Sequence, residues 1–509
     1  MMKRLSRRPG GNPAAGGRPA SRRLLALGLA LALILALPAA TLAADGSSNV
    51  YEGYTYDYYR YVKSTPAPFL PERTITAENL RGIALDSVDD VCTSADGRIF
   101  LVDSRQSRVH VLDGDGRMLK TLKTIRDADN KIVILPDGSQ LMLSGCQGAF
   151  FHEKRNELYI ADTDARRVVV LDGTDYTFRR LITRPENMTG VTEFRPAKIT
   201  VDGADRIYIV VQSSYEGIIE LNGDGTFSRY FGVNEPQVNL IDFLWKSLAT
   251  DAQKEKMGRI YAPAFNNVTL DGEGFVMAVT SDLSASKSVF RLNFQGKNVL
   301  REMGNFPVSG DFATPGDTPS TFVDIAVKPY GTYAVLDRAW GRVFLYNFDG
   351  ELLSVFGSRG NLEGEFRVPS AIAWLGDRLV IGDSALKCAY ILKPSEFGQA
   401  LLDAGEAYYY GRWDRATEAF REVLRLCSNM ETAYVGIGKN LLMQERYREA
   451  MDYFDLGNNR EFYSKAYKGY RSQVLRGHFG VIAVIGAALV ALVVGSEIAY
   501  NHRQRREHR

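Results

Sequence analysis

The sequence is poor in the residues that build metal and nucleophile sites. Its 509 residues include four cysteines and five histidines, and none of them stands in a CxxC or HxxxH spacing. A zinc centre of the usual kind is therefore excluded, and neither a Ser-His-Asp arrangement nor a glycine-rich phosphate loop is found. The cysteines are expected to be small buried residues. Cys92 and Cys146 are the one pair worth testing for a bond, because they occupy matching places in neighbouring repeats.

The chain also lacks a strong charge of either sign. Its formal net charge is +2, which gives no basic field for nucleic acid and excludes that class of partner. The local basic clusters lie at the two ends of the chain, and this pattern is typical of membrane topology.

The N-terminus has the pattern of a secretion signal. Residues 1–23 are basic and contain no acid, and a short apolar run, 24–37, ends at Pro38. The run has the length of a signal core and is short for a membrane span. We expect a signal peptide over 1–43, cleaved after Ala43, and an uncleaved anchor is the alternative.

The C-terminus has the pattern of a membrane anchor. No charge occurs over residues 479–496, so they are expected to cross a lipid bilayer within a transmembrane helix over 477–500. The basic tail, 501–509, should stay in the cytoplasm. With the N-terminal signal, this predicts a single-pass protein of the cell membrane whose middle lies outside the cytoplasm.

The region 71–395 repeats one unit six times. The clearest copies are "NELYIADTDARRVVVLDG", "GRIFLVDSRQSRVHVLDGDG" and "GTYAVLDRAWGRVFLYNFDG". Each copy reads as a strand, an Asp-led turn, a basic residue, a second strand and an Asp-Gly hairpin turn. The spacing suits four-stranded blades, so the fold class predicted here is mainly β, a six-bladed β-propeller. Residues 71–80 should supply the strand that closes the ring, and 240–258 should form a helical insertion.

These copies resemble NHL repeats, whose members include many six-bladed propellers. The resemblance implies that an Asp and the Arg that follows it make turn and inter-blade contacts and do no catalysis. The pairs are Asp103 with Arg108, Asp162 with Arg167, and Asp337 with Arg342.

Polar residues are expected around the propeller axis. Aligning the six units places Asp90, Asn267 and Asp324 just before innermost strands, together with Lys198. Six-bladed lactonases hold a metal in such a ring, and calcium accepts oxygen ligands of this type. Three ligands beside a lysine are too few, so we expect no cofactor, and a calcium-dependent extracellular lactonase or lyase is the alternative.

Residues 396–476 change to a helical period. A pattern of large, small and aromatic residues recurs after 34 positions, which resembles tetratricopeptide repeats. We expect a short helical hairpin repeat that binds a partner or serves as a rigid stalk. Its packing residues are Trp413, Ala416, Phe420, Tyr447, Ala450 and Phe454.

A tyrosine-rich segment, 44–70, precedes the propeller and continues into a proline-rich, extended stretch. Alternation predicts that Tyr54, Tyr56 and Tyr58 share one face of a strand, with Tyr59 and Tyr61 on the other. One interpretation packs one of these faces on the propeller or the helices. The other is an exposed aromatic ledge for sugar rings or a partner protein.

The layout therefore predicts a membrane-anchored scaffold or binding protein that presents its propeller outside the membrane. The resemblance implies bacterial NHL and tetratricopeptide membrane proteins, some of which accompany sugar-uptake transporters. A partner protein is expected, a membrane transporter among the candidates, and carbohydrate is a second ligand class. Whether the protein is also an enzyme stays open, with binding favoured.

Overall fold

The computed structural model describes residues 52–188, 193–212, 214, 216–232, 264–282, 285, 287–311 and 318–507. The predicted signal peptide, 1–43, and the predicted helical insertion, 240–258, lie outside the described residues.

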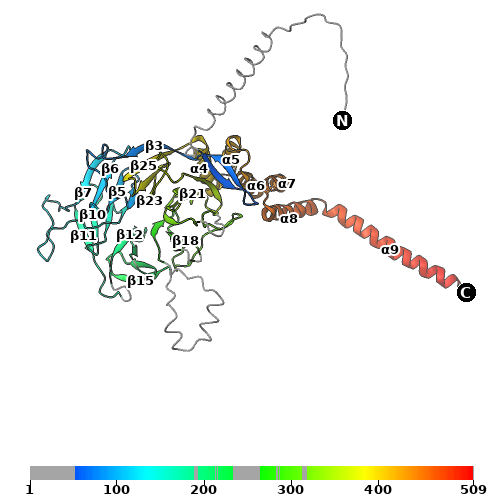
Figure 1. The fold of residues 1–509 in the computed structure, drawn as a ribbon. Helices are drawn as coiled ribbons and strands as arrows, with labels where there is room; N and C mark the ends of the chain where they lie inside the picture. The colour runs from blue at the N-terminus through cyan, green and yellow to red at the C-terminus, as the bar shows by residue number, and fades with distance from the viewer. Residues whose placement is uncertain are drawn as a thin grey trace, which may run out of the picture. The chain divides into compact units, whose positions relative to one another are not determined.

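Six antiparallel sheets carry the fold (Figure 1). Sheets one to three contain four strands each: β4 (Asp90–Thr93), β5 (Ile99–Asp103), β6 (Arg108–Leu112), β7 (Met118–Leu122); β8 (Gly148–His152), β9 (Glu157–Asp162), β10 (Arg167–Asp172), β11 (Phe178–Ile182); β12 (Pro196–Val201), β13 (Ile207–Val211), β14 (Ile218–Leu221), β15 (Phe227–Phe231). Sheet four contains β16 (Asn267–Leu270), β17 (Val276–Val279) and β18 (Val289–Leu292). Sheet five contains β19 (Phe322–Val327), β20 (Tyr333–Asp337), β21 (Arg342–Tyr346), β22 (Leu352–Phe356), β1 (Glu52–Tyr56) and β2 (Val62–Pro66). Sheet six contains β23 (Pro369–Leu375), β24 (Arg378–Asp383), β25 (Cys388–Pro394) and β3 (Phe69–Ile75).

The six sheets are the blades of a closed propeller. Their first strands contact one another in the cyclic order β4, β8, β12, β16, β19, β23 and back to β4. The second strands are buried along most or all of their length, as in β5 and β20. Each blade therefore hides one apolar face against each neighbour, and no blade could bury both faces alone. The predicted six-bladed architecture is confirmed.

Ring closure depends on a strand from the other end of the propeller sequence. Strand β3 pairs with β25 and gives blade six its fourth strand, with Arg73 opposite Ile391. Without β3, the backbone groups of β25 would form a bare sheet edge. The predicted closure by the segment before the first repeat is thus confirmed, and the strand begins at Phe69.

Strands β1 and β2 form a hairpin that extends blade five. The hairpin joins the outer edge of β22, where Tyr54 lies opposite Val355. A Cβ atom added to Gly53 would lie 2.9 Å from the Val355 carbonyl oxygen and 2.8 Å from Thr65 Oγ1. Glycine is therefore required for the close approach of the hairpin to the propeller.

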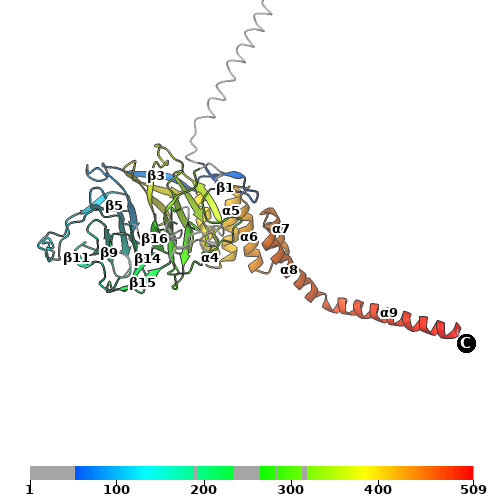
Figure 2. The same ribbon diagram turned by 60° about the horizontal axis from the view of Figure 1, so that its bottom comes forward.

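Six helices follow the propeller within the described residues: α4 (Glu396–Tyr409), α5 (Trp413–Leu426), α6 (Glu431–Met443), α7 (Tyr447–Leu456), α8 (Arg460–Gly477), α9 (Phe479–Glu507). From α4 to α8 each helix packs on the next (Figure 2). Ser395 fixes the start of α4, because its Oγ accepts the Gly398 N–H at 3.1 Å and donates to the Ala67 carbonyl at 2.7 Å. One apolar core joins blades five and six to these helices, from Phe356 to Phe397 and Phe454.

Helix α9 stands apart from this core. It is the one helix among the described residues that is long and apolar enough to cross a membrane, over Phe479–Gln504, and none of its apolar stretch is buried in the fold. The predicted order of a propeller, a helical region and one apolar helix is confirmed at this level.

Candidate functional site

Equivalent positions of the inner strands form a ring around the propeller axis. Asp90, Lys198, Asn267 and Asp324 each lie opposite the fourth residue of the second strand. In blade six the second strand begins one residue earlier, and Ala371 lies opposite its fifth residue, Gly382, directly before the turn residue Asp383. In blade two, whose second strand also begins one residue earlier, the equivalent residue is Gly148, opposite Ala161, directly before the turn residue Asp162. A side chain at Gly148 would meet the Ala197 carbonyl oxygen at 2.2 Å, so glycine is required there.

The two carboxylates of the ring join neighbouring blades. Asp90 accepts the backbone N–H of Ala149 in the next blade at 2.8 Å. Asp324 accepts the backbone N–H of Ile372 in the same way at 2.7 Å, and the amide of Asn267 donates to its other oxygen. Both acids therefore tie the inner strand of one blade to the inner strand of the next.

A lysine neutralises part of the ring. Lys198 Nζ lies 2.5 Å from Asp90 Oδ1 and 2.9 Å from the Asp89 carbonyl oxygen. Burial raises the pKa of Asp90, against the lowering effect of Lys198. Burial also raises the pKa of Asp324 to about 7, because Lys198 lowers it only in part.

This arrangement does not fit a calcium site. The Lys198 ammonium bonds one of the two predicted carboxylates, and the Asn267 amide presents a donor to the other. A calcium ion between the three predicted ligands would require Lys198 to turn away from Asp90. Among the described residues, no group of three or more His, Cys, Asp or Glu side chains could hold a metal.

The predicted turn pairs lie where the second strand of a blade turns into the third. Asp162 pairs with Arg167 at 2.8 Å, and Asp103 pairs with Arg108 at 3.5 Å. The aspartates also accept backbone N–H groups that precede the inner strand, as Asp103 does from Ser87 at 3.2 Å. They therefore fix the turn and the start of the inner strand.

The third pair differs from the other two. Asp337 accepts the backbone N–H groups of Thr321 and Ala339 at 2.8 and 2.9 Å. The guanidinium of Arg342 pairs with Asp311 instead of Asp337. The expected contact between these two side chains is thus replaced by one to the loop before blade five.

The predicted packing residues of the helical region occupy equivalent places in two helices. Trp413 and Tyr447 begin α5 and α7 and are half-buried, and Ala416 and Ala450 are fully buried. The rings of Phe420 and Phe454 are also buried. They lie against Gly436 and Gly438 of α6, where a Cβ atom would come within 2.5 and 2.7 Å of them.

The tyrosines of the N-terminal segment divide into two groups. Tyr54 and Tyr56 lie in β1, and each hydroxyl donates to Asp311 at 2.7 Å. Burial, together with Asp311, raises the pKa of both phenols. Arg342 pairs with the same carboxylate. These two rings therefore fasten the hairpin to blade five.

The other three tyrosines form the tip of the hairpin. The strand ends at Tyr56, so Tyr58 does not share its face as the alternation predicted. Tyr58, Tyr59 and Tyr61 lie in the turn and are 36, 62 and 68 % exposed. The rings of Tyr58 and Tyr59 meet edge to face with centroids 5.3 Å apart.

The tip is held rigidly although its rings are exposed. Asp57 is 6 % exposed, and its Oδ1 accepts the backbone N–H groups of Tyr59 and Tyr61, both at 2.9 Å. The backbone N–H of Tyr58 donates to Glu431 at the start of α6, at 2.7 Å. The turn is thus tied both to itself and to the helical region.

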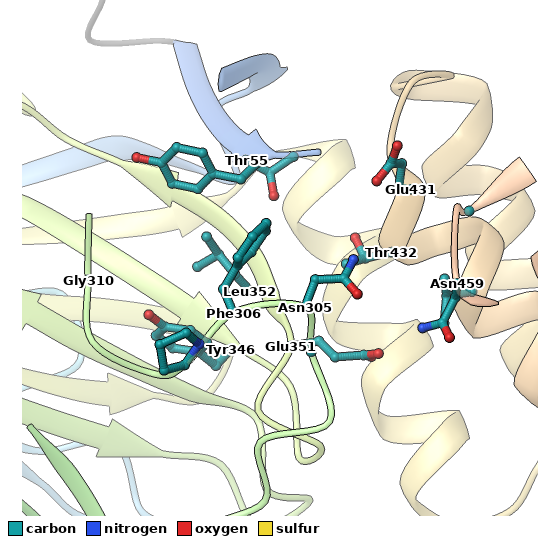
Figure 3. Close-up of a pocket in the computed structure, with 15 residues that line it drawn as sticks. Thr55, Asn305, Phe306, Gly310, Tyr346, Glu351, Leu352, Glu431, Thr432 and Asn459 are labelled. Atoms are coloured by element: carbon teal, nitrogen blue, oxygen red, sulfur yellow. The ribbon is translucent and has the colours of Figure 1, made fainter. Parts of the chain in front are cut away.

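A cavity opens beside this tip, where the hairpin, blade five and the helices meet (Figure 3). Figure 3 shows Asn305 and Phe306, from the loop after β18, facing Thr432 and Asn459 from the helical region. The Phe306 ring contacts Tyr56 edge to face at 6.2 Å. We call the tip and the cavity together the junction site: Tyr56, Tyr58, Tyr59, Tyr61, Asn305, Phe306, Thr432 and Asn459.

The junction site combines aromatic faces with polar groups. Thr432 Oγ1 is buried and has no hydrogen-bond partner among the described residues. The side-chain oxygen of Asn459 accepts the Phe462 N–H at the start of α8, at 3.0 Å. The arrangement can stack on a ring or an apolar side chain of a ligand and offer hydrogen bonds beside it.

The sequence predicted the tyrosines of this site and missed its other half. Asn305 and Phe306 lie in an inter-blade loop, and Thr432 lies in the first turn of a helix. None of them belongs to a repeat pattern, so only the folded chain brings them to the hairpin. The four cysteines, all described, are free thiols, so Cys92 and Cys146 are not bonded to each other.

Comparisons with known proteins find solved structures of low similarity and no family. No family model matches the sequence, and no curated protein matches it. Solved structures that resemble it include a streptogramin B lyase (13 % identity, 64 % of this chain and 98 % of that one, TM-score 0.39). Virginiamycin B lyase from Staphylococcus aureus gives 10 % identity, coverage of 64 % and 99 %, and a TM-score of 0.40. Kuenenia stuttgartiensis hydrazine synthase is 10 % identical over 61 % of this chain and 96 % of that one, with a TM-score of 0.38.

Proposed function

We propose that this protein is a membrane-anchored binding protein that recognises a partner protein outside the cytoplasm through the junction site. Helix α9 serves as the anchor, the NHL-like propeller as the rigid body, and the tetratricopeptide-like helices as the connection between them. The junction site is their meeting point. A transporter subunit of the same membrane is the partner we favour.

The observation that carries this proposal is the exposed but preorganised aromatic tip. Exposed tyrosines on a mobile loop would lose conformational entropy on binding. Here Asp57 and Glu431 hold the turn in place before any ligand arrives. Tyrosine and arginine, which stand here on a fixed backbone with Arg60 between the tyrosines in the sequence, are residue types that dominate protein interfaces.

Site-specific photo-crosslinking tests this proposal directly. A benzophenone amino acid at Tyr59 in the full-length protein, in membranes of its host, should capture one partner. The same probe at Phe294, which is 69 % exposed on blade four, is the matched control. Capture from Tyr59 but not from Phe294 supports the proposal, and a transporter subunit in the product would establish the accessory role.

Alanine variants complete the test. Tyr59→Ala with Tyr61→Ala should weaken the complex by about tenfold or more, as loss of interface tyrosines does, whereas Phe294→Ala should leave it unchanged. Equal capture at both probe positions would refute the proposal. Binding of an oligosaccharide that depends on the same tyrosines would instead establish carbohydrate as the ligand.

The competing proposal, a calcium-dependent lactonase or lyase at the axis ring, needs Lys198 to leave Asp90. It predicts metal-dependent turnover of a lactone or cyclic ester panel that Asp324→Ala abolishes. It also predicts that the tyrosine variants of the tip keep full activity.

A further inference from the structure

Helix α8, between the helical repeat and the apolar helix, is basic and largely exposed. It buries only Ala466 of its eighteen residues. It carries one acidic residue, Glu461, which pairs with Lys465 at 2.6 Å. Its basic residues are Arg460, Lys465, Lys468, Arg471 and Arg476.

Four aromatic or apolar residues of α8 follow the helical period. Tyr463, Tyr467, Tyr470 and Val474 recur at intervals of four, three and four residues, so they form one stripe along the helix. Tyr467 is 49 % exposed and Val474 is 38 % exposed. At 100° per residue, Arg471 lies directly beside this stripe, and Lys468 lies beyond Arg471. The cations therefore lie to one side of the aromatic stripe, with Arg476 nearly opposite it. Among the described residues Lys468, Arg471 and Arg476 form no ion pair, whereas Lys465 pairs with Glu461.

The position of α8 in the chain fixes what this face can meet. Only His478, with φ −112°, separates the last residue of α8 from Phe479, the first residue of α9. The headgroup layer of a bilayer is roughly 5–8 Å deep on each side, and a helix rises about 1.5 Å per residue. With Phe479 at the edge of the hydrocarbon, Leu475 and Arg476 lie among the headgroups even if α8 stands upright. Lys468 and Arg471 lie further from Phe479, and they reach the same layer if the chain bends at His478 so that α8 lies along the surface.

We propose that α8 is a membrane-surface helix that binds anionic phospholipid headgroups through Lys468, Arg471 and Arg476. Tyr467 and Leu475 lie at the boundary between headgroups and acyl chains, where amphipathic rings are favoured. The inference depends on α9 being the membrane anchor of the proposed function. Lipid phosphates are the occupants to which the geometry points, because the chain itself carries this face to them, and a basic helix gains about 1 kcal/mol per cation near an anionic surface.

Depth-dependent quenching tests this surface on the full-length protein. Tyr467→Trp places an indole on the stripe, and the chain without this substitution corrects for the four native tryptophans. The protein is reconstituted in nanodiscs of phosphatidylcholine, or of phosphatidylcholine with phosphatidylglycerol, both brominated near the top of the acyl chain. We expect quenching of the indole to be roughly twofold stronger with phosphatidylglycerol, since the anionic surface holds α8 down.

Charge variants identify the residues responsible. Lys468→Gln with Arg471→Gln should reduce quenching in phosphatidylglycerol to the phosphatidylcholine level. Arg421→Gln with Arg448→Gln removes the same charge from exposed positions of α5 and α7, and this matched control should keep the difference between the lipids. Retention of the fold is checked by the melting temperature of each variant.

The possible outcomes distinguish anchoring by α9 from headgroup binding by α8. If the protein enters nanodiscs but the indole is quenched equally in both lipids, the proposal that α8 binds anionic headgroups is refuted, and the role of α9 as the anchor stands. Release of the chain by alkaline carbonate, with no incorporation, overturns both. Loss of the lipid difference in the control variant as well would show a general charge effect, and it would equally refute a headgroup site on α8.

Discussion

Replacement of Lys439 should loosen the attachment of the helices to the propeller. Lys439 lies on α6 and is 4 % exposed. Its Nζ lies 2.8 Å from Asp349 Oδ2 and 2.9 Å from Glu351 Oε1, both in the turn between β21 and β22. The carboxylates are also nearly inaccessible to water. This buried cluster is the polar part of an interface that is otherwise apolar.

The expected loss of unfolding free energy follows from the contacts that the two carboxylates keep when Lys439 is replaced. In Lys439→Met, Asp349 keeps the Tyr408 hydroxyl at 2.9 Å and Arg301 at 3.1 Å. Glu351 keeps only the Asn347 amide, at 2.8 Å. Breaking a buried ion pair from one side costs about 3–5 kcal/mol. Because Arg301 still compensates Asp349, we expect about 3 kcal/mol of lost unfolding free energy.

The stabilisation by this buried cluster should depend on pH. Burial alone would lower the pKa of Lys439, but Glu351 and Asp349 raise it above the ordinary value. Burial alone would raise the pKa of Asp349, but Lys439 leads the interactions that bring it below the ordinary value. The stabilisation by the Lys439 charge is therefore complete below pH 10.5 and is lost as pH rises through the pKa of Lys439 in the folded protein. The stabilisation by the Asp349 charge is complete above pH 3.8 and is lost as pH falls through the pKa of Asp349 in the folded protein.

Chemical unfolding of the full-length protein in detergent, followed by hydrogen exchange of the α6 backbone, measures the effect. The triple variant Lys439→Met, Asp349→Asn, Glu351→Gln removes all three charges and should recover most of the loss. A cost below about 1 kcal/mol for Lys439→Met at pH 7 would refute the reasoning. So would a triple variant that is no more stable than the single one.

Three further predictions concern the helices and the axis ring. Gly438→Ala should destabilise the fold by about 1–3 kcal/mol in thermal melts, because the added Cβ atom would lie 2.7 Å from the Phe454 ring. The control Gly477→Ala, which has open space around it, should be neutral or stabilising. The pKa of Asp324 is raised to about 7, so the contribution of this carboxyl group to stability declines as pH rises from 3.8 to 7. Asp324→Asn cannot ionise, and this part of the pH dependence should be absent from its denaturant titrations. Millimolar calcium should leave the melting temperature unchanged because Lys198 already bonds Asp90; a rise that depends on calcium concentration would establish metal binding.

The strands could be predicted because their signals are local. The copy "NELYIADTDARRVVVLDG" was expected to hold two strands joined by an Asp-led turn, and it contains β9 and β10. The 34-residue period is also a local signal, and the residues that repeat with it occupy equivalent places in α5 and α7. Closure by β3 followed from counting strands, since a ring with one incomplete blade needs a strand from elsewhere.

The missed features are set by contacts between distant parts of the chain. The pairing of Tyr54 with Val355 joins strands some 300 residues apart, and no local pattern encodes it. Lys439 reads as a surface residue in the sequence "GIGKNLL", and only the turn at Asp349 makes it a buried one. Tyr58 was assigned to a strand because alternation continues past the residue where Asp57 turns the chain.

Ring closure and helix docking are coupled through the same short segment. The chain between the hairpin and β3 presents the Ala67 carbonyl to Ser395, which caps α4. The Pro68 carbonyl oxygen lies where a Cβ atom of Gly398 would stand, 1.8 Å away, so α4 can sit there only with a glycine in its first turn. Strand β3 then closes blade six, and the hairpin places its tyrosine tip against Glu431 of α6. Because one stretch of backbone makes all three attachments, loss of any of them weakens the others. The rigidity of the junction site is therefore a consequence of how the ring is closed.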